Sequence, residues 1–158
     1  MTPGRVLGSA AIQGGGALAT YVVGRASGAE TRAARIGQQL VRAQLVTQAT
    51  TFAIKVAVRR PRPDGGRFSL PSGHASTAFA TATILDGHFG WRVSVPTYVL
   101  ATYVATSRLH ENRHNASDVV FGAAVGIAAG RVTLRREKSR VVIQPVAMGG
   151  GAGVIVLW

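Results

Sequence analysis

Three short clusters of residues could together bind and transfer a phosphoryl group. They are Lys55 with Arg62-Pro63, then Pro71-Ser72-Gly73-His74, and then Ser107-Arg108 with His114 and Asp118. Together they supply three cations, a serine hydroxyl, a glycine turn, two imidazoles and one carboxylate. Cations and hydrogen-bond donors stabilise phosphoryl oxygens, and an imidazole can attack phosphorus or pass a proton. The set predicts an anion site that carries its own nucleophile.

The middle cluster predicts a helix start that binds an anion. If Ser72 caps a helix, the N–H groups that follow point outward, and the helix dipole adds to their attraction for negative charge. Gly73 lets a ligand oxygen approach the backbone closely, and His74 on the first turn could donate a proton to the same ligand. Taken alone, such a string is more often an ordinary capped helix with a surface histidine.

The first cluster brings two cations towards one rim. Lys55 and Arg62 are about two helical turns apart, and the prolines at 61 and 63 end the helix and move Arg62 into the following loop. Further cations that add to the local field are Arg59, Arg60 and Arg67. Taken alone, this cluster is more often a solvated basic helix end.

The third cluster pairs an imidazole with a carboxylate. Asp118 follows His114 by four residues, about one helical turn. The carboxylate can accept a hydrogen bond from one ring nitrogen and leave the other unprotonated, as a nucleophile or base requires. Arg108 adds a forked donor for phosphate oxygens. A single His/Asp pair at this spacing is more often a helix-start interaction, but the two other clusters favour the chemical interpretation.

The supply of acidic residues argues against a metal. The carboxylates of the sequence are Glu30, Asp64, Asp86, Glu111, Asp118 and Glu137. Hard cations need several clustered oxygen ligands, and these six are scattered along the chain. No cysteine is present, so there is neither a disulfide nor a thiolate site. We therefore expect a phosphate site that uses no metal.

The three strings together resemble a known family. Lys-x6-Arg-Pro, Pro-Ser-Gly-His and Ser-Arg-x5-His-x3-Asp look like the signature of the type 2 phosphatidic acid phosphatase superfamily, in order and with compatible gaps. That superfamily also holds bacterial non-specific acid phosphatases, lipid phosphate phosphatases and vanadium-dependent haloperoxidases. The strings span Lys55 to Asp118, and the surrounding helical segments extend the similarity to about residues 5–134.

The resemblance implies a metal-independent phosphatase of phosphomonoesters or diphosphates, including lipid-linked ones, that forms a phosphohistidine intermediate. His114 would attack phosphorus, and Asp118 would orient it and stabilise its charge. His74 would protonate the leaving group and then help to activate water. The phosphate-binding residues would be Lys55, Arg62, Ser72, Gly73 and Arg108. No cofactor is implied, and vanadate is expected to inhibit.

Two other functions fit part of the sequence. The same residues would hold vanadate in a vanadate-dependent haloperoxidase, although such enzymes usually have much longer chains. A non-catalytic basic protein that binds anionic lipid or nucleic acid would explain the net charge of +12. The two Trp, three Tyr and five Phe residues form no stacking pattern, so we expect no nucleic-acid partner.

The elements that must position the clusters are helices. The sequence predicts an all-α fold, a helical bundle of about five to six helices with the site at helix ends, and a short C-terminal β-hairpin. The predicted helices cover residues 6–24, 29–60 (one helix or two in series), 73–85 after a Ser72 cap, 92–107 and 118–134 after a Ser117 cap. A break is predicted at 87–90, with His88 in a surface loop.

Two domains of unequal size follow from this pattern. Residues 1–138 form the helical phosphatase domain, and residues 139–158 form a hairpin tail that packs on the same domain or on a partner chain, because an isolated hairpin is marginally stable. The sequence does not fix the oligomeric state; a homodimer is one alternative.

The hydrophobic pattern bears on location. No run reaches about 18 consecutive apolar residues, the mark of a clear membrane span; residues 7–23 come closest and are more simply a core helix than a signal or anchor. The 29–60 segment carries Arg and Gln on its outer faces, which predicts a water-facing helix. We expect a soluble or peripheral protein of the bacterial cell envelope, periplasmic or membrane-associated, with a weakly hydrophobic integral protein as the alternative. The partners would be a phosphorylated small molecule or lipid and a membrane surface.

Overall fold

The computed structural model describes residues 3–28, 31–138, 142–148 and 151–157. These ranges contain six helices and two strands. The elements are α1 (Pro3–Leu7), α2 (Ala10–Ala26), α3 (Arg32–Val58), α4 (Gly73–Phe89), α5 (Trp91–His110), α6 (Ala116–Lys138), β1 (Val142–Met148) and β2 (Gly151–Leu157). The predicted helical bundle of five to six helices is confirmed.

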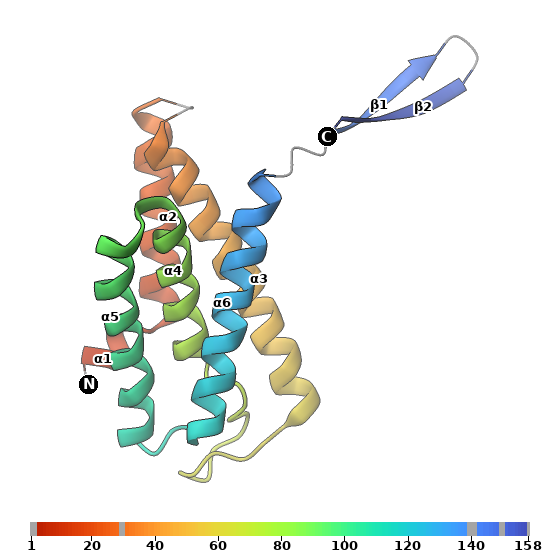
Figure 1. Cartoon of the computed structure of the whole chain (residues 1–158). Coiled ribbons are helices and arrows are strands. Elements are labelled where there is room, and N and C mark those ends of the chain that lie inside the picture. The colour runs from red at the N-terminus through yellow and green to blue at the C-terminus, as the bar shows by residue number, and fades with distance from the viewer. Residues whose placement is uncertain (1–2, 29–30, 139–141, 149–150, 158) are drawn as a thin grey trace.

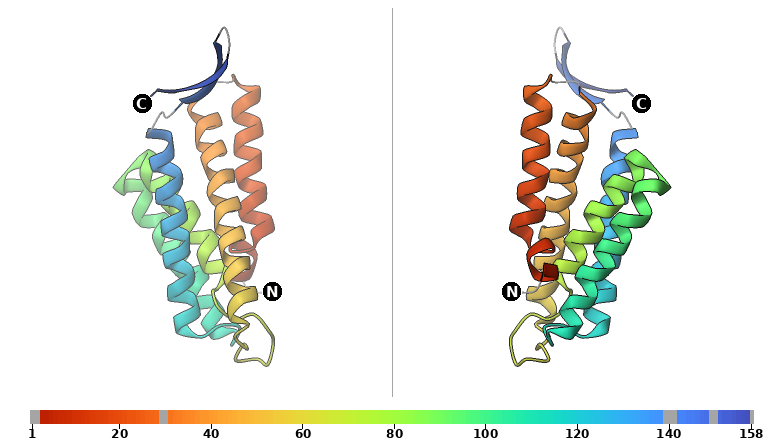
Figure 2. Two further views of the ribbon diagram at one scale, coloured as in Figure 1. Left: turned by 90° about the vertical axis from the view of Figure 1, so that its right-hand side faces the viewer. Right: turned by 90° about the vertical axis from the view of Figure 1, so that its left-hand side faces the viewer.

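The five long helices run alternately up and down, so that neighbours in the chain are antiparallel (Figure 1). Helix α4 lies at the centre and contacts α3, α5 and α6, whereas α2 packs mainly on α3. The two side views show that the 59–72 loop, the start of α4, the end of α5 and the start of α6 all lie at the same end of the bundle (Figure 2). Sequence segments that are far apart in the chain therefore meet at one end.

Prolines and glycines set the helix ends, with small differences from the prediction. Helix α3 stops at Val58, before the prolines, because Arg59 adopts a left-handed conformation (φ 51°) and closes the helix with its N–H on the Lys55 carbonyl. Helix α4 continues past Gly87 and ends at Gly90, whose φ is 70°. His88 is therefore helical, not in a loop, and its Nε2 lies 2.7 Å from the Gln39 side-chain oxygen.

Small residues form most of the bundle interior. The buried apolar residues are largely alanines, joined by a few larger side chains such as Ile84 and Val104. Three glycines of α6 face α4, where an added Cβ would lie 2.5 Å from Ser72 O at Gly122, 2.1 Å from Ser76 O at Gly126 and 2.7 Å from Thr83 Cβ at Gly130. The backbones of α4 and α6 therefore approach too closely for any side chain at these positions.

The outward surfaces of the helices carry large apolar side chains. Leu45, Phe52, Trp91, Val99 and Val120 are all exposed, from 64% at Val99 to 73% at Trp91. Such a surface is unusual for a protein surrounded by water, because extended apolar patches commonly mark a partner or a membrane.

The predicted facing of α3 is wrong in part. Gln39 and Gln44, which were assigned to its water-facing side, are buried, and the Gln44 amide donates to the Thr77 carbonyl of α4. Val46, although apolar, is 45% exposed. The glutamines turn inward because the α4 backbone and hydroxyl groups offer them hydrogen-bond partners.

Strands β1 and β2 pair antiparallel, with Val142 opposite Leu157 and Met148 opposite Gly151. They lie beyond the C-terminal end of α6 in Figure 1. The solved structures compared below support the helical bundle and do not support the hairpin. The division at residue 138 and the docking of the tail stay predictions.

By length and composition, one segment of the described chain could cross a membrane. It is Ala116–Arg135 of α6, with a mean hydropathy of 1.4. A buried core helix passes the same test, so this segment alone does not place the protein in a membrane.

The close approach of α6 to α4 gives a stability prediction. In Gly126→Ala the new methyl group meets a backbone oxygen that cannot move alone, so we expect the free energy of unfolding to fall by about 1–3 kcal/mol, the usual cost of overpacking. Denaturant unfolding measures this. The matched control is Gly16→Ala on α2, where nothing lies within 4 Å and stability should rise by up to ~1 kcal/mol. Equal effects of the two substitutions would contradict the assigned α4–α6 contact.

Candidate functional site

The three sequence clusters lie where α3 and α5 end and where α4 and α6 begin. Lys55 is on the last turn of α3, Arg62 is in the loop that follows, and Ser72 and His74 begin α4. Arg108 lies near the end of α5. His114 precedes α6, and Asp118 lies on its first turn. The antiparallel order of the bundle brings these segments to one end (Figure 1).

Buried hydrogen-bond donors without partners mark this end of the bundle. Among the described residues, the buried side-chain polar atoms that lack a partner are Gln44 Oε1, Thr47 Oγ1, Arg62 Nε, Ser72 Oγ, Arg108 Nε and Arg108 Nη1. Four of these six atoms belong to predicted phosphate-binding residues. Buried donors in native proteins nearly always have a partner, so donors from a loop, a helix start and a helix end without one indicate an anion site.

Ser72 has the backbone of a helix cap but does not use its side chain as one. Its φ and ψ are −71° and 111°, and its hydroxyl makes no capping hydrogen bond. Its N–H donates to the Asp118 carbonyl at 2.8 Å, which fixes the start of α4 against α6. The predicted cap is therefore correct in position only, and the hydroxyl is left for a ligand. At Gly73 an added Cβ would lie 3.9 Å from Thr51 Cγ2, so this side of the turn is open.

One end of the Arg108 guanidinium forms an ion pair, and the other end has no hydrogen-bond partner. It is 3% exposed, and its Nη2 lies 2.8 Å from Glu111 Oε2. The Nε and Nη1 atoms have no partner, so the guanidinium can still offer two donors to phosphate oxygens. Glu111, for which the sequence suggested no chemistry, thus orients a predicted phosphate-binding residue.

Lys55 is a cation whose charge is easily lost. Its Nζ donates to the Phe68 carbonyl at 2.7 Å, which directs it across the 59–72 loop. Burial and then the nearby Arg62 charge lower the pKa of Lys55 to about 8, and Asp118 opposes this shift. A bound dianion would stabilise the protonated form.

His114 is buried and neutral near pH 7. Burial, followed by the positive charges of Lys55 and Arg62, lowers its pKa to about 4. The backbone of Ser69 and the carboxylate of Asp118 oppose the shift. A neutral imidazole keeps a lone pair on one nitrogen, which a nucleophile requires.

The predicted direct hydrogen bond between His114 and Asp118 is not formed. His114 Nδ1 and Asp118 Oδ2 are 3.9 Å apart, and Oδ2 instead accepts from the Ser69 hydroxyl at 2.5 Å and from the Asn115 N–H at 2.8 Å. The other oxygen, Oδ1, accepts from Arg60 Nη1 at 2.9 Å. Asp118 therefore makes the helix-start interaction that the spacing also allowed, through Asn115 at the head of α6.

Two residues of this arrangement lie outside the predicted site set. Arg60 had been noted only as part of the local field, yet it binds both Asp118 and the Ser117 hydroxyl. This contact engages Ser117, and the helix begins one residue earlier, at Ala116, so the predicted Ser117 cap is wrong. Ser69 carried no sequence signal, because a serine in a polar loop is unremarkable until the fold places it beside Asp118.

His74 faces the short N-terminal helix as well as the site. Burial and the Arg108 charge lower its pKa to about 4, and a hydrogen bond with the Arg5 backbone opposes this. A Cβ added at Gly8 would lie 3.1 Å from His74 Cδ2, so the turn after α1 lies against the ring. His74 is thus neutral near pH 7 and must gain a proton before it can act as an acid.

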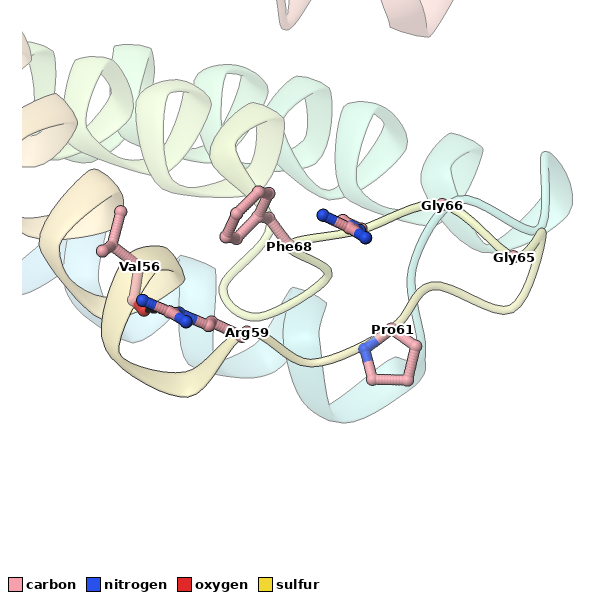
Figure 3. Close-up of a pocket in the computed structure, with 7 residues that line it drawn as sticks. Val56, Arg59, Pro61, Gly65, Gly66 and Phe68 are labelled. Atoms are coloured by element: carbon pink, nitrogen blue, oxygen red, sulfur yellow. Dashed lines mark hydrogen bonds between the residues drawn. The ribbon is translucent and has the colours of Figure 1, made fainter.

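A recess is lined by the end of α3 and the loop that follows it (Figure 3). It measures about 560 Å³ and is lined by Val56, Arg59, Pro61, Gly65, Gly66, Arg67 and Phe68. The Phe68 carbonyl that accepts from Lys55 belongs to this same segment. The recess therefore has mixed polar and apolar walls and shares this loop segment with the partner of Lys55.

Comparison with known families identifies the central part of the chain. Residues 64–141 match the family model described as the PAP2 superfamily. This segment of the chain belongs to the PAP2 superfamily. It contains the second and third clusters, whereas Lys55 and Arg62 lie just ahead of it. The predicted resemblance to the type 2 phosphatidic acid phosphatase superfamily is confirmed.

Similar sequences include three bacterial phosphatases. The lipid A 1-phosphatase of Porphyromonas gingivalis is 48% identical over 82 residues, which is 49% of this chain and 18% of that protein. The lipid A 4'-phosphatase of Helicobacter pylori is 29% identical over 64% of this chain and 58% of its own length. The decaprenylphosphoryl-5-phosphoribose phosphatase of Mycobacterium tuberculosis is 33% identical over 55% and 53%. The chain thus spans between 18% and 58% of these relatives.

Two solved structures share the fold. The crystal structure of Aquifex aeolicus LpxE matches with a TM-score of 0.72 at 20% identity and covers 84% of this chain and 81% of that one. A transmembrane PAP2 type phosphatidylglycerolphosphate phosphatase from Bacillus subtilis matches with a TM-score of 0.66 at 22% identity, over 89% and 80%. At these identities the likeness concerns the arrangement of helices.

The lowered pKa of Lys55 predicts how the affinity for an anion depends on pH. Because its pKa is about 8, the affinity of His114→Ala protein for a phosphomonoester, which this variant should not hydrolyse, should fall as the pH rises through 8. The second ionisation of a phosphate group is centred near pH ~6 and is nearly complete by then. Calorimetric titration at pH 7 and pH 9 measures the loss, and Lys55→Arg should remove most of it, since arginine keeps its charge. The same loss in Lys55→Arg would show that another group controls binding.

Proposed function

We propose that this protein is a metal-independent phosphatase that hydrolyses a lipid-linked phosphomonoester or diphosphate through a phosphohistidine intermediate. The set of buried, unpaired donors on Arg62, Ser72 and Arg108 is the observation that carries the proposal. They adjoin an imidazole that is neutral near pH 7. Membership of the PAP2 superfamily and the named phosphatases among its relatives support the same reaction class.

The first step is attack by His114 on phosphorus. Its Nδ1 faces Ser69 and Asp118, which leaves Nε2 as the attacking atom. The Nε2–P bond forms as the bond from phosphorus to the leaving oxygen breaks. Lys55, Arg62 and Arg108 stabilise the negative charge on the phosphoryl oxygens, and preorganised positive charge of this kind supplies much of the catalysis in phosphoryl transfer.

The leaving oxygen takes a proton from His74. The pKa of this ring is about 4 without substrate, and a phosphate dianion beside it favours the protonated form. The bound substrate therefore raises the pKa of His74 and favours the protonated ring that acts as the acid. In the second step the neutral His74 accepts a proton from water as the water attacks the phosphohistidine, which releases phosphate and restores both rings.

The reaction in this proposal needs no metal. Among the described residues, no three His, Asp or Glu side chains are grouped as metal ligands. The cations of the site occupy the role that metal ions have in other phosphoryl-transfer enzymes.

A lipid substrate fits the surface of the bundle. Large apolar side chains point outward on α3, α5 and α6, including Phe52, Val99 and Val120. Relatives named for lipid A and decaprenylphosphoryl substrates carry the same superfamily region. We propose that the protein is membrane-associated in a bacterial envelope and that its substrate reaches the site from the membrane surface.

Hydrolysis of an aryl phosphate in the presence of a chelator tests the proposal. The wild-type protein should release phosphate, and His114→Ala should lower kcat/KM by at least ~10³-fold because the nucleophile is lost. His74→Ala should be most damaging for alkyl phosphates, whose leaving groups need a proton, and least for nitrophenyl phosphate.

His110→Ala is the matched control, because this exposed histidine ends α5 outside the predicted set. Folded wild-type protein that is inactive on aryl, lipid and diphosphate substrates would refute the proposal. Bromination of an indicator dye that depends on vanadate would favour the haloperoxidase alternative instead.

Membrane association predicts the behaviour of the exposed apolar residues. The chain should sediment with membranes prepared without detergent. Replacing Leu45 and Phe52 by glutamine should raise the soluble share, because each fully buried large apolar side chain contributes about 1.5–3 kcal/mol. Glutamine at Thr50, which is exposed on the same helix, is the control and should change little. Wild-type protein found wholly in the supernatant would contradict this part of the proposal.

A further inference from the structure

The Ser69 hydroxyl lies between His114 and Asp118, the two side chains that the sequence predicts to be in direct contact. It donates to Asp118 Oδ2 at 2.5 Å and lies 3.5 Å from His114 Nδ1. The side chain is fully buried, and the Ser69 N–H donates to the Arg60 carbonyl at 2.7 Å. The position of this hydroxyl is therefore set by the loop backbone and by Asp118.

The hydrogen bonds of Asp118 Oδ2 leave no room at that oxygen for a direct bond from His114. Oδ2 accepts from the Ser69 hydroxyl, from the Asn115 N–H and, at 3.3 Å, from the Asn115 side-chain amide. Oδ1 accepts from Arg60. A carboxylate offers about four acceptor positions, two on each oxygen, and the three donors at Oδ2 fill the positions on that oxygen. This accounts for the distance of 3.9 Å between His114 Nδ1 and Asp118 Oδ2.

The direction of these hydrogen bonds fixes the role of the hydroxyl. An ionised carboxylate can only accept, so the single Ser69 hydroxyl proton is committed to Asp118. The lone pairs of Ser69 Oγ then face His114 Nδ1, which can only donate to them. This arrangement favours the tautomer with the proton on Nδ1 and the lone pair on Nε2.

We propose that Ser69 is a positioning residue that links Asp118 to His114 and selects the reactive tautomer of the nucleophile. This inference rests on the proposed function, since it concerns the same histidine. Hydrogen bonds of this kind are often long without substrate and shorten in the reacting complex, so the distance of 3.5 Å from Oγ to Nδ1 fits a contact that tightens as the ring gains charge.

The proposed link moves no proton during attack. As the Nε2–P bond forms, positive charge spreads over the ring, and the Nδ1–H bond to Ser69 Oγ strengthens. The Ser69 hydroxyl keeps its proton and continues to donate it to Asp118. The carboxylate therefore stabilises the charged ring through the hydroxyl dipole. The ring returns to neutrality when water displaces it from phosphorus, and Nδ1 remains protonated throughout.

Ser69→Ala isolates the hydroxyl, because the backbone contact with His114 is retained. We expect kcat to fall by about 10- to 100-fold, by analogy with metal-binding histidines, for which loss of the supporting hydrogen bond has an effect of this size. KM should change little, since Ser69 is not among the phosphate-binding residues. Ser69→Thr keeps a hydroxyl and should recover most of the activity. The control is Thr83→Val, which removes a buried hydroxyl in the middle of α4 and should leave kcat unchanged.

The tautomer gives a readout that does not depend on activity. Nitrogen NMR of the His114 ring should show the proton on Nδ1 in wild-type protein and Ser69→Thr, and a larger share on Nε2 in Ser69→Ala. If the tautomer and kcat are the same in Ser69→Ala as in wild type, the positioning role is refuted and the phosphatase proposal stands. If the tautomer responds but wild-type protein hydrolyses no phosphate, the proposed function fails and the positioning role stands.

A double-mutant comparison tests whether the hydroxyl acts through the carboxylate. In an Asp118→Asn background, the further change Ser69→Ala should cost less than ~3-fold in kcat, because interacting residues are not additive. The full 10- to 100-fold loss in both backgrounds would show that Ser69 acts independently of Asp118 and would overturn the proposed link.

Discussion

The close contact between α4 and α6 is the constraint on which the site depends. At Gly122 and Gly126 the two backbones approach so closely that a Cβ would meet a backbone oxygen of α4. At the site end this contact culminates in the hydrogen bond from the Ser72 N–H to the Asp118 carbonyl. The turn that carries Ser72 and Gly73 and the turn that carries Asp118 are thereby fixed to each other through main-chain atoms, whose geometry varies less than that of long side chains.

The acidic side chains of the site are satisfied by some of its donors, and other donors are left without a partner and can bind a ligand. Asp118 is satisfied by Arg60, Ser69 and Asn115, and Glu111 engages one end of Arg108. Arg62 Nε and the Nε and Nη1 atoms of Arg108 are buried without a partner. A buried guanidinium with unsatisfied donors is costly to maintain, and this cost is offset when an anion binds. The +12 net charge of the chain supports the same end by attracting anions from a distance.

The sequence predicted the helices well, and the structure brings the eight predicted site residues to one end of the bundle, because both depend on local signals. Proline, glycine and hydrophobic spacing located α2 to α6 within a few residues, and the strings around His74 and His114 are short and contiguous. It could not predict that Ser69 lies between His114 and Asp118, because this depends on how the 59–72 loop folds over the start of α6. The inward turn of Gln44 was missed for a related reason, since its partner is the Thr77 carbonyl of another helix.

One ion pair joins the loop that carries Arg62 to the loop that carries His114. Arg113 Nη1 lies 2.6 Å from Asp64 Oδ2, and both side chains are partly exposed, at 40% and 24%. The hydrogen bond from Arg113 keeps the pKa of Asp64 below its usual value, so the pair is charged at any pH near neutrality. Dissolved salt weakens exposed pairs much more than buried ones. Ionic strength thus weakens the contact between the two loops, while the buried guanidinium of Arg108 is largely shielded from the same ions.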